Sequence, residues 1–153
     1  MKIGLVTPYI YPTPGGVNEH VDHLYRNLRL RGHDVRIISA SHGFQRSTEG
    51  DIIRLGKGFS VPANGSMGTL TLSPRYASQV RRTIAEEHFD LLHFHEPFVP
   101  FLSPLLLRES RSVNVATFHA YGGFSPAYEL GSRFLDGYAR RLHGRIAVSA
   151  AAR

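Results

Sequence analysis

Three segments of this 153-residue chain carry groups suited to binding an oxygen-rich ligand. A glycine pair, Gly15-Gly16, stands where a helical apolar pattern begins, so the backbone could approach a ligand closely and the helix N-terminus could offer N–H groups to an anion. His95-Glu96 and His119 each follow a short apolar run. A neutral imidazole at a strand end can hydrogen-bond a sugar hydroxyl or a phosphate. The glycine pair is compatible with a phosphate site. The structural alternatives are a tight turn at the glycines and histidines satisfied by the backbone.

Common phosphate-binding motifs are excluded by residues that the chain lacks. A dinucleotide-binding loop needs G-x-G-x-x-G and an acid near the end of the second strand, where this chain has Ser39-Ala40-Ser41. A P-loop needs Gly-Lys followed by Ser or Thr, which is missing. A receiver domain needs paired acids after the first strand, where Thr7 and Pro8 stand. The glycine pair therefore belongs to another kind of phosphate-binding loop.

The sequence around these residues alternates short apolar runs with amphipathic stretches, which is typical of a parallel sheet flanked by helices. The predicted strands are residues 3–6, 35–40, 52–55, 91–94, 113–118 and 146–148. Helices are predicted over about 17–31, from residue 74 onward, in a leucine-rich segment that ends near 110, and over about 126–143. We expect an α/β, Rossmann-like, doubly wound and mostly parallel sheet with helices on both faces. Its functional residues should lie at the carboxyl ends of the strands.

Two histidines, His93 and His95, occur in one predicted strand. Because they sit two apart, we expect them to point to opposite faces of the strand, so that at most one faces the site at the strand end. We choose His95, together with Glu96, because these residues lie nearer to that end.

Composition indicates a globular protein, with 42% hydrophobic and 20% charged residues and no cysteine. The net charge of +6 would suit nucleic acid, an anionic membrane or a phosphorylated substrate, but the basic residues are scattered along the chain. No apolar run approaches the roughly 20 residues that span a bilayer, and no signal peptide is evident, so we expect a cytoplasmic protein. The chain ends just after the sixth predicted strand, and we expect residues 1–153 to be one domain of a longer protein.

Five motifs occur in an order that resembles the N-terminal domain of the family 4 retaining glycosyltransferases, which have the GT-B fold. They are Pro14-Gly15-Gly16-Val17, Arg31-Gly32-His33-Asp34-Val35, Asp90-Leu91-Leu92-His93-Phe94-His95-Glu96-Pro97, Ala116-Thr117-Phe118-His119 and Gly144-Arg145-Ile146-Ala147-Val148-Ser149. The likeness extends to Val61-Pro62 and Asn64-Gly65-Ser66. Within the family, the chain is similar to members that mannosylate phosphatidylinositol. The likeness covers nearly the whole chain.

This resemblance implies an enzyme of two Rossmann-like domains with its active site between them. The present chain would be the acceptor-binding domain, and a C-terminal donor-binding domain, absent from this chain, would be its partner. Gly15 and Gly16 would lie against the donor diphosphate. His119 would be the catalytic residue beside the transferred sugar. Tyr9 and Asn64 would contact the acceptor, with His95 and Glu96 nearby. Thr13 stands where the phosphatidylinositol-specific members have aspartate, so identical acceptor contacts are not expected.

The resemblance also bears on cofactors and on the membrane. It implies a nucleotide diphosphate sugar as co-substrate and no cofactor. A metal cluster of His95, Glu96 and His119 is conceivable but not favoured, because GT-B enzymes generally manage the leaving phosphate with basic residues and a helix terminus, so no metal is expected. Arg81 and Arg82 match part of a basic cluster that engages anionic membrane in the related enzymes. The apolar residues of the preceding loop, among them Phe59 and Met67, would add to this contact, although an ordinary solvated helix face is an equal alternative.

The function expected from this resemblance is retaining transfer of a hexose to a hydroxyl of a lipid or polyol acceptor, such as a phosphoinositide. The enzyme would be cytoplasmic and peripheral to the membrane, and it would not bind nucleic acid. Two alternatives remain open. One is a family member that acts on a soluble acceptor, such as an inositol phosphate or a sugar. The other is a free-standing, flavodoxin-like binding module.

Overall fold

A computed structural model of the chain describes residues 1–43, 45–57, 59–63, 66–70, 74–99, 101–119 and 136–150, with side chains between 57 and 75 outside that description. Seven strands form one sheet in the order β3-β4-β2-β1-β7-β8-β9. Every neighbouring pair is parallel except β3 and β4. The strands are β1 (Lys2–Ile10), β2 (Asp34–Ser41), β3 (Ser47–Glu49), β4 (Ile52–Lys57), β7 (Leu91–His95), β8 (Val113–Phe118) and β9 (Gly144–Ala147). The predicted doubly wound, mostly parallel sheet is confirmed.

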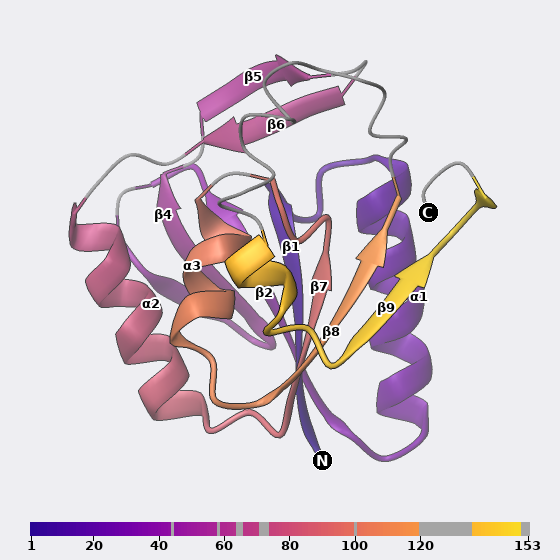
Figure 1. Cartoon of the computed structure of the whole chain (residues 1–153). Coiled ribbons are helices and arrows are strands. Elements are labelled where there is room, and N and C mark those ends of the chain that lie inside the picture. Colours follow the sequence, from indigo (N-terminus) through magenta and orange to yellow (C-terminus); the bar gives the residue numbers. More distant parts are fainter. Residues whose placement is uncertain are drawn as a thin grey trace.

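Helices cover both faces of this sheet (Figure 1). They include α1 (Gly16–Leu30), α2 (Pro74–Glu87) and α3 (Leu102–Glu109). Successive strand residues point to opposite faces, so neighbours in one strand enter different cores. Leu5 belongs to the cluster that packs against α1, and the adjacent Val6 belongs to the cluster under α2 and α3. The apolar runs of the sequence are therefore buried on both sides, as a parallel sheet requires.

Two glycines explain local features of this arrangement. Gly4 lies in the central strand β1, where an added Cβ would come within 2.6 Å of Leu92 Cδ2 on the adjacent strand. Gly32 follows the end of α1 with φ of +81°, a left-handed conformation that ends helices readily in glycine. The predicted end of the first helix is thus confirmed.

Several segments differ from the sequence-based expectation. Strand β1 continues to Ile10, because the pairing with β2 resumes at Ile10 after a register shift. Strand β9 begins at Gly144, two residues before its predicted start. The segment predicted as an apolar loop instead contains an antiparallel hairpin of β5 (Phe59–Ala63) and β6 (Ser66–Leu70). Of the helix predicted over about 126–143, only residues 136–139 are described as helical, and 126–135 lie outside the described residues.

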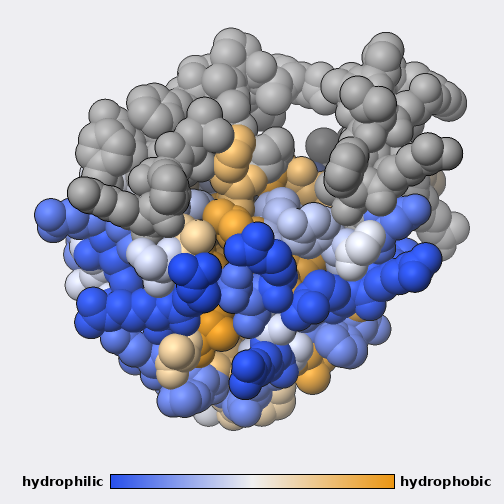
Figure 2. Space-filling model, turned by 60° about the vertical axis from the view of Figure 1, so that its left-hand side comes forward, coloured by the Kyte–Doolittle hydropathy of each residue, from blue (hydrophilic) through white to orange (hydrophobic). Residues whose placement is uncertain are grey.

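None of the described helices is long and apolar enough to cross a membrane. Figure 2 shows the face turned toward α2, where hydrophilic residues cover most of the described surface and hydrophobic residues are visible between them.

Candidate functional site

The predicted functional residues converge at the carboxyl ends of the central strands. His95 is the last residue of β7, His119 follows β8 directly, and Tyr9 lies near the end of β1. The chain runs from β1 through α1 to β2, which pairs with one side of β1, whereas β7 pairs with the other side of β1. This reversal of strand order is the position where doubly wound sheets bind their ligands.

Three histidines form the centre of this site. The Nδ1 atom of His95 lies 3.0 Å from Nε2 of His119. His20, from the second turn of α1, packs edge-on against both rings, with ring centroids 5.4 Å from His95 and 4.9 Å from His119. One ring nitrogen from each histidine lies within 4.8 Å of the other two, so these residues could hold a metal ion. Glu96 is not a member of this group.

The expectation that only one of His93 and His95 faces the site is wrong. Residues two apart in a strand share a face, and the two rings stack with centroids 4.6 Å apart and planes 22° apart. The His93 Nε2 atom lies 2.7 Å from the hydroxyl of Thr117 on β8. His93 therefore forms the inner layer beneath His95, and Thr117 fixes its ring.

All four histidines of this region are neutral at pH 7. Burial, followed by the neighbouring rings, lowers the pKa of His95 to about 2 and the pKa of His93 to about 4. Burial and then His20 lower the pKa of His119 to about 4. Burial and then His23 lower the pKa of His20. The site therefore offers neutral imidazoles and not a cluster of positive charge.

The hydrogen bonds assign the protons on His95 and His119. His95 Nε2 is buried and has no hydrogen-bond partner, so a proton there would be a buried, unsatisfied donor. We therefore place the His95 proton on Nδ1, from which it is donated to His119 Nε2. A neutral His119 then carries its own proton on Nδ1. Among the described residues no group accepts that N–H, so it could donate to an oxygen of a ligand.

Glu96 holds the backbone at this point. Its Oε1 accepts a hydrogen bond from the backbone N–H of His119, and its own N–H donates to the carbonyl of Thr117 at 3.0 Å. Glu96 has φ of +52°, an uncommon conformation for a non-glycine residue. Burial and then the Glu96 carboxylate raise the pKa of Tyr9, which places Tyr9 in the field of that carboxylate. Glu96 thus positions His119 and contributes negative potential beside Tyr9.

The glycine pair leaves the N-terminus of α1 uncovered at the same end of the sheet as the histidines. The Gly15 carbonyl accepts the first helical hydrogen bond, from Glu19 N–H at 2.9 Å, and no side chain among the described residues caps this end. The preceding N–H groups are therefore available to an anion. A Cβ added to Gly16 would meet nothing within 4 Å. The space in front of Gly16 is open, as a ligand would need.

Asn18 holds the loop before the glycines in place. It was not predicted as a functional residue from the sequence. Its Nδ2 donates to the carbonyls of Ile10 at 3.1 Å and Thr13 at 2.7 Å, and its Oδ1 accepts from the Thr7 hydroxyl at 2.9 Å. His20 was missed as well. Its signal was its spacing, since a residue three after Val17 lies on the apolar stripe of the helix that faces the sheet.

The structure does not place the other predicted residues at this site. Asn64 lies outside the described residues, and Phe59 in β5 and Met67 in β6 are described in their backbone only. Arg81 and Arg82 lie on α2 and form ion pairs, the first with Glu109 at 4.0 Å and the second with Glu86 at 2.6 Å. These two arginines are therefore not part of the histidine site.

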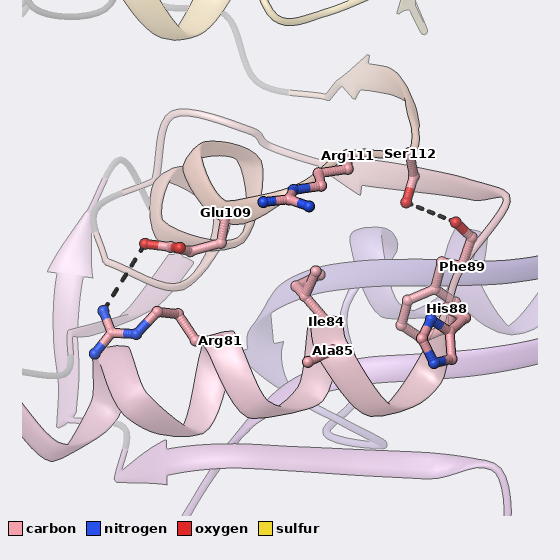
Figure 3. A pocket seen from close by; sticks show the side chains of 8 residues that line it. All are labelled: Arg81, Ile84, Ala85, His88, Phe89, Glu109, Arg111 and Ser112. Atoms are coloured by element: carbon pink, nitrogen blue, oxygen red, sulfur yellow. Dashed lines mark hydrogen bonds and ion pairs between the residues drawn. The ribbon is translucent and has the colours of Figure 1, made fainter.

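A hollow of about 600 Å³ lies at the amino ends of β7 and β8, opposite to the histidine site (Figure 3). It is lined by Arg81, Ile84, Ala85, His88, Phe89, Glu109, Arg111 and Ser112. Figure 3 shows Arg81 and Glu109 joined across it, and the Ser112 hydroxyl donates to the Phe89 carbonyl at 2.7 Å. These residues precede β7 and β8, so the hollow is separate from the carboxyl-end site.

The chain matches known proteins in sequence and in fold. The family model for Glycosyltransferase Family 4 matches residues 14–153. A phosphatidyl-myo-inositol mannosyltransferase of Mycolicibacterium smegmatis is 38% identical over 153 residues, which are all of this chain and 39% of that protein. The protein of the same name from Propionibacterium freudenreichii is 33% identical over 158 residues, covering 99% of this chain and 42% of that protein. The chain thus spans about two fifths of the length of the curated relatives it matches.

Solved structures share the fold at low sequence identity. An α-glucosyltransferase in complex with UDP and a 13-mer DNA has a TM-score of 0.61 and 14% identity, covering 98% of this chain and 37% of that one. MurG of Acinetobacter baumannii has a TM-score of 0.58 and 14% identity, covering 99% of this chain and 42% of that one.

Proposed function

This chain belongs to glycosyltransferase family 4, and from this premise we propose that it is the acceptor-binding domain of a retaining enzyme that transfers a hexose from a nucleotide diphosphate sugar. The acceptor we propose is the inositol ring of phosphatidyl-myo-inositol, because relatives of that name are 33–38% identical along essentially the whole chain. The donor-holding domain corresponds to the length of those relatives that this chain does not span. Family membership favours an enzyme over a free-standing flavodoxin-like module.

One observation supports this proposal above the others. His119, neutral and held by His95 and Glu96, lies at the strand-order reversal beside His20 from the helix that begins at Gly16. The site thus joins a donor for a sugar hydroxyl or phosphate oxygen to a helix N-terminus suited to a diphosphate. Transfer from a nucleotide diphosphate sugar uses the hydrogen-bond donor to hold the sugar and the helix N-terminus to stabilise the leaving diphosphate.

The chemistry asked of these residues is positioning and charge stabilisation. The free N–H groups of α1 would stabilise the negative charge that develops on the leaving diphosphate. The His119 Nδ1–H would orient the transferred sugar through one hydroxyl or phosphate oxygen. The Glu96 carboxylate is engaged by the His119 backbone, so we assign it no role as nucleophile. We propose no resident cofactor for this reaction.

Tyr9 is the acceptor residue that the geometry supports best. It lies on the central strand, in the field of Glu96, and at the same edge as His119. A tyrosine ring with a protonated hydroxyl can both pack against and hydrogen-bond a polyol ring. We propose this contact with the inositol ring, and Asn64 as a second contact.

Peripheral binding to anionic membrane is proposed for access to the lipid acceptor. Arg81 and Arg82 form ion pairs, but their side chains are 56% and 69% exposed, so they remain available to anionic lipid. The two acceptors can be separated by assay. Phosphatidylinositol in vesicles and soluble inositol phosphate would be offered to the full-length protein with mannose donors that differ in their nucleoside.

The experiment that tests the site compares two glycine substitutions in the full-length protein. Gly16→Ala places a methyl group in the open space before α1, where nothing lies within 4 Å, so the fold should be unchanged. The matched control is Gly137→Ala, since Gly137 also has open space around it and lies in the helical turn at residues 136–139, before β9. We expect Gly16→Ala to lower the affinity for the donor at least tenfold and Gly137→Ala to leave it unchanged.

Two results would reject the proposal. Wild-type protein that binds a nucleotide sugar without releasing nucleotide in the presence of either acceptor class would be a binding module. Normal turnover by Gly16→Ala with correct folding would leave the glycine pair as a turn and remove the diphosphate from this position.

A further inference from the structure

We propose that His20, His95 and His119 form a binding site for a transition-metal ion of the Zn²⁺ class, and that an ion bound there inhibits sugar transfer. The binding itself rests on the geometry of the three rings. The inhibition rests on the proposed function, because ligation would rotate the His119 ring, whose Nδ1–H is proposed to orient the donor sugar.

The ring spacing matches a three-histidine metal site. With a Zn–N bond of about 2.0 Å and tetrahedral angles, imidazole centroids around one ion are about 5 Å apart. The three centroid distances here are 5.4 Å, 4.9 Å and 5.3 Å. One nitrogen from each ring already lies within 4.8 Å of the other two. Small rotations of His20 and His119, which are only partly buried, can complete the convergence.

The surroundings hold the ligands in place. His95 is fully buried and its ring stacks on His93. The His119 backbone is fixed by Glu96, whose carboxylate also adds negative potential. Fixed orientation of ligands by outer contacts of this kind strengthens metal binding.

The ligand types select the ion. Three neutral imidazoles suit Zn²⁺, Cu²⁺, Ni²⁺ and Co²⁺, whereas Mg²⁺ and Ca²⁺ require oxygen ligands. The ion must replace the hydrogen bond between His95 and His119, so only a metal with strong affinity for nitrogen can occupy the site. His20 and His119 leave one side of the cluster partly exposed, through which an ion can enter.

The site has no role in the proposed transfer reaction. An ion in place of the hydrogen bond between His95 Nδ1 and His119 Nε2 would rotate the His119 ring, so its Nδ1–H would leave the position from which it is proposed to orient the donor sugar. The consequence is a competitive relation between the nucleotide sugar and Zn²⁺.

The test uses the full-length protein freed of metal with a chelator. Co²⁺ should bind one ion per chain and give the visible absorption of a tetrahedral site, and Zn²⁺ should displace it. His20→Gln should weaken binding of both ions at least tenfold, since disturbing even an outer partner of a metal ligand costs about that much. The matched control is His23→Gln, one helical turn away on α1 and exposed, which should bind as the wild type does. Mg²⁺ at the same concentration should not compete.

Three results would overturn the metal site: less than one ion per chain, absence of the tetrahedral spectrum, or equal binding by His20→Gln and the wild type. Inhibition is measured separately, as the rise in apparent KM for the donor with Zn²⁺ and its reversal by chelator. A protein that binds the ion but transfers sugar at an unchanged rate keeps the metal site and refutes the inhibition. A protein that binds the ion and never transfers sugar keeps the metal site and refutes the proposed function.

Discussion

Replacing Asn18 with alanine should destabilise the domain, because this buried side chain ties the glycine loop to the central strand. Three hydrogen bonds are lost, two to the carbonyls of Ile10 and Thr13 and one from the hydroxyl of Thr7. A typical bond of this kind contributes about 1 kcal/mol net, for a total of about 3 kcal/mol. The higher helix propensity of alanine returns about 0.5 kcal/mol. We expect a loss of about 2 to 3 kcal/mol in the free energy of unfolding.

Urea unfolding followed by circular dichroism measures this loss. With an m-value of about 2 kcal/mol per molar, the midpoint should fall by roughly 1 M. The control is Asn27→Ala on the same helix, where the side chain is exposed and bonds only the carbonyl of His23. This variant should stay within about 0.5 kcal/mol of the wild type, as surface substitutions usually do.

A second variant separates hydrogen bonding from packing. Asn18→Asp keeps the shape and the acceptor for Thr7 but turns an oxygen toward the two carbonyls, so it should be at least as unstable as Asn18→Ala. Wild-type stability in Asn18→Asp, or equal midpoints for Asn18→Ala and Asn27→Ala, would refute the reasoning. The loop would then be held by its backbone alone.

Three further predictions concern His119, Tyr11 and the arginine pair of α2. His119→Ala should lower kcat by about 10²-fold. His119→Asn should retain more activity than His119→Gln, because the asparagine amide nitrogen replaces Nδ1. The reverse order of activities in steady-state assays would contradict the assigned tautomer. Burial and the bond to Asp22 raise the pKa of Tyr11 to about 12, so Tyr11 contributes stability below pH 10 that is lost as pH rises toward 12. The advantage of the wild type over Tyr11→Phe in urea unfolding should therefore shrink between pH 10 and 12, and a constant difference would argue against a shifted pKa. Replacing Arg81 and Arg82 with serine should weaken sedimentation with anionic vesicles roughly thirtyfold at low salt and less at high salt, whereas unchanged binding would identify an ordinary solvated helix face.

The sheet could be predicted from the sequence because its strands are buried on both faces. Runs such as Val113 to Phe118 are apolar enough to be recognised, and that strand has its predicted bounds. The hairpin of β5 and β6 was not predicted, because glycines and Pro62 interrupt its pattern and favour a loop. Strand β1 was predicted too short, because Thr7 and Pro8 resemble the start of a turn. What holds Thr7 in the strand is Asn18, a contact between distant residues that no local pattern reveals.

The candidate site was predicted in part. His95, Glu96 and His119 follow predicted strands, and neighbouring parallel strands bring such ends together, so their convergence could be expected. His20 could not be chosen in the same way, because a histidine within a helix is most often a surface residue and its pairing depends on where α1 crosses the sheet. The predicted orientation of His93 was wrong, because residues i and i+2 of a strand point to the same face and not to opposite faces.

The pairing of β1 with β7 has a consequence for how the domain folds. Ile3 pairs with Val35 in β2 and with Leu91 in β7, so the second contact closes a segment almost three times as long as the first. Closing the longer segment costs about 1 kcal/mol more in chain entropy, and contacts of high sequence separation slow folding. Both sides of the histidine cluster depend on that pairing. The cluster should therefore assemble late, and any ligand that binds it should slow unfolding without accelerating folding.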